Sequence, residues 1–204
     1  MLTPYKIEHL RQKICDIEKH FQLDTYRGEF GEYLPWDELR DSQKLYVRAY
    51  VALCHAEIEN YFEQWAAHIV NKAFSLWETE KKITLPLFSL FVHFRFIDTK
   101  NANTEQKVHQ MKDLFKRSVI ERNDGIREDN IRELFRPLGM DDGVINSISP
   151  VLNSFGNQRG QTVHSSTQTQ KPLDIPTLIS DVNNILQGIR LFEHSLEALS
   201  RSND

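Results

Sequence analysis

The apolar residues near the C-terminal end of the sequence recur at alternating steps of three and four. The stripe consists of Leu178, Val182, Ile185, Ile189, Phe192, Leu196 and Leu199. This spacing places all of them on one face of a helix. The pattern therefore predicts a long amphipathic helix that packs antiparallel to the longest helix of the chain, within a bundle.

A second and longer helical pattern begins at Asp37 or Asp41 and continues to about Thr79. Its main stripe is formed by Val47, Val51, Cys54, Ile58, Phe62, Trp65 and Ile69. Other apolar residues widen this surface to most of the circumference, namely Tyr46, Ala49, Tyr50, Leu53, Ala56 and Ala66. A helix that is apolar nearly all round is predicted to lie buried at the centre of the domain.

Four polar residues interrupt this apolar surface: His55, Glu57, Glu59 and Asn60. Buried ionisable groups need partners, or their pKa values shift. We expect Glu57 to face solvent. His55 and Glu59 are one helical turn apart and share a face, so they either pair with each other or look together into a cleft.

Shorter helical patterns fill most of the remaining sequence. They cover residues 3–21, 106–120, 126–135, 141–148 and 150–155, and residues 85–96 form a short helix or a packed loop. Residues 22–40 form an irregular connection, and residues 165–176 form a polar loop. Because neither a strand pattern nor an internal repeat is evident, the sequence predicts one all-α domain over residues 1–204, an up-down helical bundle with a long central helix.

The composition excludes several classes of protein. The 204 residues are 40% hydrophobic and carry a formal net charge of -4, so the chain as a whole is neither disordered nor strongly basic. Eight basic residues against six acidic ones between positions 106 and 136 give a local excess of positive charge. Cys15 and Cys54 fit reduced thiols, and neither a disulfide framework nor a zinc-ligand spacing is present. Without an apolar leader or a spanning segment, a cytoplasmic location is expected.

A polar, glycine-punctuated stretch at residues 156–166 is predicted to join a helix that stops at Gly156 to the final helix. It contains Arg159 and His164. A histidine takes and gives protons near neutral pH, and an arginine binds phosphate oxygens. The two side chains suit metal-independent cleavage of an RNA phosphodiester. Alternatively, Arg159 caps the preceding helix and His164 hydrogen-bonds a carbonyl group.

The segment Arg159-Gly160-Gln161-Thr162-Val163-His164 resembles the Arg-x(4 to 6)-His signature of the HEPN superfamily, and residues 53–62 resemble the long-helix segment of its defence-linked branches. The resemblance implies an all-helical, usually dimeric domain and a ribonuclease of toxin–antitoxin or antiviral defence systems. It makes Arg159 and His164 the catalytic pair, with Glu59, His55 and Ser165 in support. It also implies RNA and an antitoxin or other inhibitor protein as partners, and neither a cofactor nor a metal.

Two positions depart from the pattern of the superfamily. Gly160 stands where active members often carry asparagine or another polar residue, and Ser166 stands where some carry a tyrosine. A non-catalytic HEPN-like module that binds RNA, a nucleotide or a partner protein is therefore the alternative. A third hypothesis makes the terminal stripe, including Phe192 and Leu196, a dimer interface. A single catalytic histidine in each chain does not readily serve as both base and acid. A ribonuclease of this kind is therefore expected to act as a homodimer.

Overall fold

The computed structural model describes the backbone of residues 6–94, 103–164 and 172–201, and the side chains of these residues except 160–164. The α-helices are α1 (Ile7–Phe21), α2 (Asp41–Glu80), α3 (Leu85–His93), α4 (Thr104–Phe115), α5 (Glu128–Phe135), α6 (Asp142–His164) and α7 (Ile175–Arg201). Short 3-10 turns are η1 (Leu23–Thr25), η2 (Trp36–Glu38) and η4 (Arg136–Leu138), and η3 (Lys116–Ile120) is a π-helical turn. Within these ranges the only β pairing is one isolated bridge, so the predicted all-α fold is confirmed.

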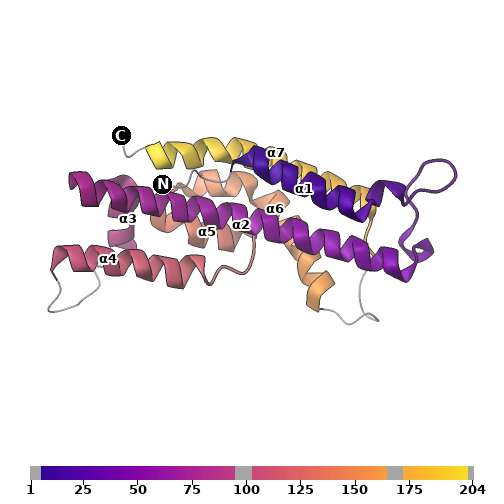
Figure 1. Ribbon diagram of the computed structural model, residues 1–204, viewed down its shortest axis with the longest axis horizontal. Coiled ribbons are helices and arrows are strands. Elements are labelled where there is room, and N and C mark those ends of the chain that lie inside the picture. The colour runs from indigo at the N-terminus through magenta and orange to yellow at the C-terminus, as the bar shows by residue number, and fades with distance from the viewer. Residues whose placement is uncertain (1–5, 95–102, 165–171, 202–204) are drawn as a thin grey trace.

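The three helices α1, α2 and α7 run side by side along the long axis of the molecule (Figure 1). α3 and α4 lie at the end of the molecule where α2 ends, and α5 and α6 cover another side of α2. One cluster of buried apolar side chains extends from α1 to α7. No helix in the described part of the chain is both long and apolar enough to cross a membrane.

The long central helix is buried on fewer sides than its composition predicts. Its main stripe is fully buried, as expected, but Tyr46 is 47% exposed and Leu53 is 46% exposed. Ala56 is also exposed. The bundle covers α2 with α1, α7 and α6 and leaves this remaining strip of its surface uncovered. Apolar composition alone therefore overstates how much of the helix is enclosed.

The final helix runs parallel to α2, so the predicted antiparallel packing is wrong. The Tyr61 hydroxyl donates a hydrogen bond to Glu193, at 3.0 Å. Seven residues further along both helices, the Ser200 hydroxyl lies 3.4 Å from the His68 ring nitrogen. Both residue numbers rise together, which only parallel helices allow.

The antiparallel partner of α7 is α6. Gln158 of α6 bonds to Asp181 near the start of α7, whereas Gly188, further along α7, packs against Ile148, which precedes Gln158 in α6. Hydrophobic periodicity identifies the buried face of a helix but not the direction of its neighbour. This explains why the stripe was recognised and its partner was not.

The stripe on α7 belongs to the core of this chain. Phe192 is 2% exposed and Leu196 is fully buried. The Phe192 ring lies 5.9 Å from the ring of Phe62 and 5.8 Å from that of Phe135, both in edge-on arrangements. The hypothesis that this stripe forms a dimer interface is therefore wrong.

α6 is one continuous helix, although two separate helices were predicted there. Pro150 lies inside it. A proline in this position removes one backbone hydrogen bond and usually kinks a helix. The helix continues because apolar residues on both sides of the proline are buried in the same core, Ile145 and Ile148 before it and Leu152 and Phe155 after it.

The predicted polar loop before α7 ends earlier than residue 176, because α7 begins at Ile175. The Asp174 carboxylate accepts hydrogen bonds from the Thr177 backbone N–H at 3.0 Å and from its hydroxyl at 2.6 Å, as a residue at a helix N-cap does. Ser165 and Ser166 lie outside the described residues. The irregular connection at 22–40 is present and contains η1, η2 and the isolated bridge between Arg27 and Tyr33.

Candidate functional site

Arg159 and His164 lie within α6 and not in a connection after it, because the helix continues to His164. Helix geometry separates these two positions by about 7.5 Å along the axis and about 140° around it. Since no helix ends at Gly156, Arg159 has no helix terminus to cap there, and this part of the alternative is wrong; the hydrogen bond from His164 to a carbonyl group stays a prediction. Arg159 is half-buried. The side chain of His164, like the whole of Ser165, lies outside the described part of the chain.

Gly156 is a site of close packing and not a helix stop. A Cβ atom at this position would lie 2.7 Å from Cγ of Arg127 and 3.8 Å from Cγ1 of Ile126. The absence of a side chain therefore lets the stem of Arg127 lie directly on the α6 backbone. Positions three apart share a face of a helix, so this stem lies on the face that carries Arg159.

Arg127 is the residue that sequence reasoning missed at this face. Its side chain is exposed, with the guanidinium group beyond the stem that packs on Gly156. The sequence pattern counted Arg127 only as one of eight basic residues between positions 106 and 136. The glycine was the available signal, because a glycine within a helix often marks close packing.

Hydrogen bonds fasten α6 to its neighbours on both sides of Gly156. The Gln158 amide donates to the Asp181 carboxylate of α7 at 2.8 Å. The Asn153 side chain accepts a hydrogen bond from the backbone N–H of Glu128, at the start of α5, at 2.9 Å. The part of α6 just before Arg159 is thus held between α5 and α7. This limits the directions in which the side chain of Arg159 can point.

The polar residues of α2 lie on two different flanks of that helix. His55 is 2% exposed, and its Nδ1 lies 3.6 Å from Oε2 of Glu59, which is farther than a hydrogen bond allows. The two residues are neighbours, as their spacing predicts. Glu57 is turned to the α1 flank, where its carboxylate lies 4.0 Å from Nζ of Lys13 and is 27% exposed.

Glu63 extends the flank of His55 and Glu59 by one more turn. Its carboxylate accepts a hydrogen bond from the side-chain amide of Asn123 at 2.9 Å. Burial raises the pKa of Glu63, the nearby charge of Glu59 raises it further, and the Asn123 hydrogen bond opposes both effects. The spacing of four residues from His55 to Glu59 and from Glu59 to Glu63 was the sequence signal for this group.

The loop between η3 and α5 connects this flank of α2 to the face of α6. Asn123, near the start of the loop, bonds to Glu63, and Arg127, at its end, packs on Gly156. Four residues of extended chain span at most about 14 Å. The carboxylates of α2 and the arginine-bearing face of α6 therefore border one short loop.

The arrangement places acid–base groups at one end of that loop and cationic groups at the other. Arg127 and Arg159 offer guanidinium groups that fit phosphate oxygens, and His55, Glu59 and Glu63 offer groups that bind or exchange protons. Among the described residues, no three His, Cys, Asp or Glu side chains are grouped so that they could hold a metal ion. The chemistry that these side chains support is binding of a phosphate ester together with proton transfer.

An all-helical bundle with an Arg and a His near the end of its penultimate helix defines the class of HEPN domains. The model of the RiboL-PSP-HEPN family matches residues 36–198, which include α2 and α6 in full, and the chain belongs to this family. Families of HEPN domains are associated with nuclease or other RNA-related functions. Comparisons with curated proteins and with solved structures give no match.

Proposed function

We propose that the protein is a metal-independent endoribonuclease of the toxin or defence type that acts in the cytoplasm as a homodimer, with Arg159 and His164 as its catalytic pair. The observation that carries the proposal is that two arginines share one face of α6. The stem of Arg127 packs on Gly156, and Arg159 lies about one turn after Gly156. Two guanidinium groups on one rigid face suit the phosphate groups of an RNA strand. The family match supports a nuclease or RNA-related function.

In the proposed reaction, one His164 removes the proton of a ribose 2'-hydroxyl, and the oxygen attacks the adjacent phosphorus. The bond from phosphorus to the 5'-oxygen breaks, and that oxygen receives a proton from an acid. Arg159 stabilises the negative charge that develops on the non-bridging oxygens. The products are a 2',3'-cyclic phosphate and a 5'-hydroxyl group, so no water, metal or cofactor is consumed in this step.

The dimer supplies the second proton-transfer group. One imidazole acts as the base while the imidazolium of the second copy protonates the leaving oxygen, as general acid–base catalysis requires. The positions of Arg159 and His164 diverge by about 140° around α6, so one copy does not readily direct both side chains at one phosphate. A two-fold arrangement of two α6 helices resolves this geometry, since each copy contributes one side of the cleft.

The polar flank of α2 supports the pair. Glu59 and His55 are proposed to orient the catalytic groups or the ribose, and Ser165 follows His164 directly in the sequence. In a cell such a nuclease needs restraint, so an antitoxin or another inhibitor protein is proposed as its partner. Expression of the active protein is then expected to arrest growth, whereas expression of His164→Ala is not.

The direct test is RNA cleavage by purified protein in the presence of a chelator. Wild type is expected to produce fragments with 2',3'-cyclic phosphate ends, and His164→Ala and Arg159→Ala are expected to produce far fewer. Arg190→Ala removes an equal charge from an exposed position of α7 and serves as the matched control. Cleavage by His164→Ala at the wild-type rate would show that the proposal is wrong.

The alternative is a non-catalytic module that binds RNA, a nucleotide or a partner protein. The observations that favour it are the divergence of the two positions around α6 and the presence of Gly160 directly after Arg159. It predicts RNA binding without turnover, and an affinity that falls steeply with salt concentration because phosphate contacts release counterions. Arg159-dependent production of cyclic phosphate ends would exclude it.

A further inference from the structure

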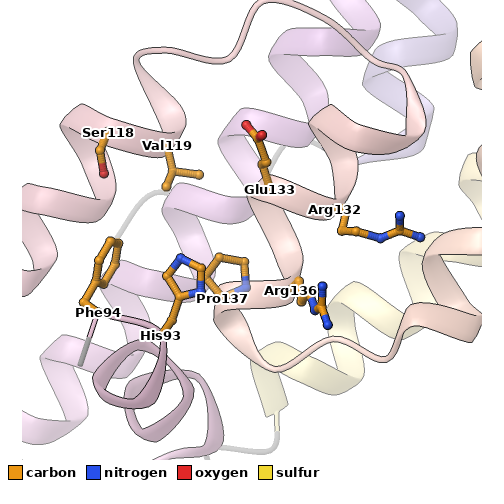
Figure 2. Close-up of a pocket in the computed structure, with 8 residues that line it drawn as sticks. All are labelled: His93, Phe94, Ser118, Val119, Arg132, Glu133, Arg136 and Pro137. Atoms are coloured by element: carbon orange, nitrogen blue, oxygen red, sulfur yellow. The ribbon is translucent and has the colours of Figure 1, made fainter. Parts of the chain in front are cut away.

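A cleft with both polar and apolar lining lies between α3, η3, α5 and η4, and it shares no residue with the face of Arg159. It has a volume of about 480 Å³. Ligand pockets for small molecules typically measure about 300–1,000 Å³, so one nucleotide unit fits this volume. The cleft is lined by His93, Phe94, Ser118, Val119, Arg132, Glu133, Arg136 and Pro137 (Figure 2).

The two ends of the cleft differ in chemistry. His93 and Phe94 stand at one end, and the guanidinium groups of Arg132 and Arg136 stand at the other (Figure 2). The two rings meet at right angles with their centroids 4.9 Å apart, which leaves ring surface available for a planar ligand group. Glu133 points away from both guanidinium groups (Figure 2), so its carboxylate does not neutralise them directly.

The two arginines are held in place unequally. Arg132 donates from Nη2 to Glu128 at 2.7 Å and to Asn146 at 2.8 Å, which orients its guanidinium group. Arg136 is 63% exposed and forms an ion pair of 3.7 Å with Asp142. The same carboxylate lies 3.5 Å from Nε of Arg132, which is buried and makes no hydrogen bond.

Asp142 is therefore a loose anionic partner that two arginines share. Both distances exceed those of charge-assisted hydrogen bonds, which are about 2.7–2.9 Å. A phosphate group carries more charge and more acceptor oxygens than a carboxylate and can bind the exposed guanidinium group of Arg136 at these shorter distances, whereas the buried Nε of Arg132 stays beside Asp142. Ligand binding would then replace the long contact of Arg136 with a shorter one.

The fourth wall of the cleft comes from the π-helical turn η3, which carries Ser118 and Val119. π-helical turns are rare and are frequent at functional sites. Here the turn replaces regular helix at the end of α4 and contributes an apolar side chain and a hydroxyl to the cleft. The hydroxyl of Ser118 donates to the Leu114 carbonyl at 2.6 Å, so its oxygen keeps lone pairs for a ligand donor.

We propose that this cleft binds a nucleoside phosphate, either free or as one unit of an RNA strand. The phosphate lies against Arg136 and Arg132, and the base lies against Phe94 and His93. Aromatic stacking of a base and cationic contacts to its phosphate are the two interactions that hold single-stranded nucleic acid in sequence-tolerant sites. The site is independent of cleavage at Arg159 and His164 and does not require that activity.

Titration calorimetry with adenosine 5'-monophosphate tests the proposal on the full chain. Adenosine without phosphate is expected to bind at least about tenfold more weakly, because the charge-assisted hydrogen bonds are lost. Arg136→Ala is expected to weaken binding of the monophosphate about tenfold, and Phe94→Ala to a similar extent through lost stacking. Asp142→Asn is expected to strengthen binding, because it removes the competing carboxylate.

Arg190→Ala, which removes a charge from the exposed face of α7, is the matched control and is expected to bind as wild type does. Arg136 is exposed and is not part of the core, so its substitution is expected to leave the fold intact. Equal affinities for Arg136→Ala, Arg190→Ala and wild type would overturn the proposal, as would the absence of any binding at millimolar concentrations.

A 5'-phosphorylated RNA trinucleotide distinguishes a free nucleotide from a unit of an RNA strand as the ligand. Its 2'-hydroxyl groups are replaced by 2'-O-methyl groups, so that it cannot be cleaved. If it binds at least tenfold more tightly than the monophosphate and Arg136→Ala removes the advantage, the cleft is a subsite for an RNA strand. If the two ligands bind equally, the cleft holds a free nucleotide. Retention of this binding in His164→Ala would separate the site from the proposed cleavage site, so failure of one proposal does not imply failure of the other.

Discussion

The protein contains two polar clusters on α2 that differ in how completely they are enclosed. Glu193 of α7 is 9% exposed and accepts hydrogen bonds at 3.0 Å from the hydroxyl of Tyr61 and at 3.0 Å from the backbone N–H of Ile7. Burial and the neighbouring carboxylate raise the pKa of Tyr61, so the phenol remains a hydrogen-bond donor at neutral pH. This cluster joins three helices and is closed to solvent.

The other cluster, on the opposite flank of α2, is looser. His55 and Glu59 lie 3.6 Å apart, Glu59 is 18% exposed, and Arg127 on the neighbouring loop is exposed. Polar groups that are buried with short internal bonds stabilise a fold, whereas polar groups with long contacts and access to solvent retain capacity for a ligand. The comparison therefore assigns a structural role to Glu193, whereas the flank of His55 and Glu59 keeps the capacity for a ligand that the proposed function requires.

The largest expected effect is on catalysis and comes from the proposed catalytic pair on α6. Arg159→Ala and His164→Ala are each expected to lower the rate of RNA cleavage by about 10²- to 10⁴-fold, because charge stabilisation or proton transfer is lost. Initial rates on a labelled RNA in the presence of a chelator measure the effect. Both variants are expected to unfold at the wild-type temperature. If Arg159→Ala loses stability and cleavage in proportion, Arg159 holds the fold and the comparison fails.

The next effect is on stability and comes from the enclosed cluster. Glu193→Ala leaves two buried donors without an acceptor, which is expected to lower the free energy of unfolding by about 2–3 kcal/mol. Tyr61→Phe removes one donor, and the expected loss is about 1 kcal/mol. Urea unfolding measures both. The folded fraction of each variant is expected to cleave RNA at the wild-type rate, and a selective loss of cleavage would give Glu193 a functional role as well.

A smaller effect tests the packing of Arg127 on α6. In Gly156→Ala the new methyl group occupies the place of the Arg127 stem, which then has to shift. The expected change in stability is within about 1 kcal/mol, because the gain in helix propensity offsets part of the packing cost. Cleavage is expected to fall to the level of Arg127→Ala.

The double variant Gly156→Ala/Arg127→Ala sharpens this test. If the glycine acts only through Arg127, the two effects on cleavage are not additive, and the double variant cleaves RNA as Arg127→Ala does. Additive effects would show that Gly156 influences the site by another route.

Much of the fold could be predicted from the sequence, because long apolar stripes determine which face of a helix is buried. The bounds and core faces of α2 and α7 follow from such stripes. The features that could not be predicted depend on neighbours in space. Pro150 and Gly156 are local signals of helix interruption, yet buried residues on both sides of the proline and the stem of Arg127 explain their presence inside α6.

The same reasoning applies to the candidate site. Arg159 and His164 were found through a motif, and His55 and Glu59 through helical spacing. Glu63 continues the four-residue spacing of His55 and Glu59, but its bond to Asn123 and the packing of Arg127 on Gly156 depend on the loop that joins Asn123 to Arg127. Periodicity describes one helix at a time, and contacts between a loop and two helices are not encoded in it.

The smallest expected effect concerns Glu63, whose pKa is raised by burial and by Glu59. Because its pKa is higher in the folded state than in the unfolded chain, the ionised carboxylate weakens the fold at neutral pH. Stability is then gained as the pH falls through the folded pKa toward the unfolded value near 4.5. Glu63→Gln keeps an acceptor for Asn123 and removes the charge. It is expected to be more stable than wild type at pH 7 by no more than about 0.5 kcal/mol, since the group is partly solvated.

Urea unfolding of both proteins at a series of pH values measures this difference, which is expected to vanish below the unfolded pKa. Glu105→Gln is a control of opposite sign, because the hydrogen bond and charge of Lys81 lower the pKa of Glu105. A group with a lowered pKa stabilises the fold above its unfolded pKa, and this contribution is lost as the pH falls through the folded value. If Glu63→Gln instead destabilises the protein at pH 7, the charge of Glu63 is compensated in the folded state. The polar flank of α2 would then resemble the enclosed cluster around Glu193, and its side chains would not be available to bind a ligand.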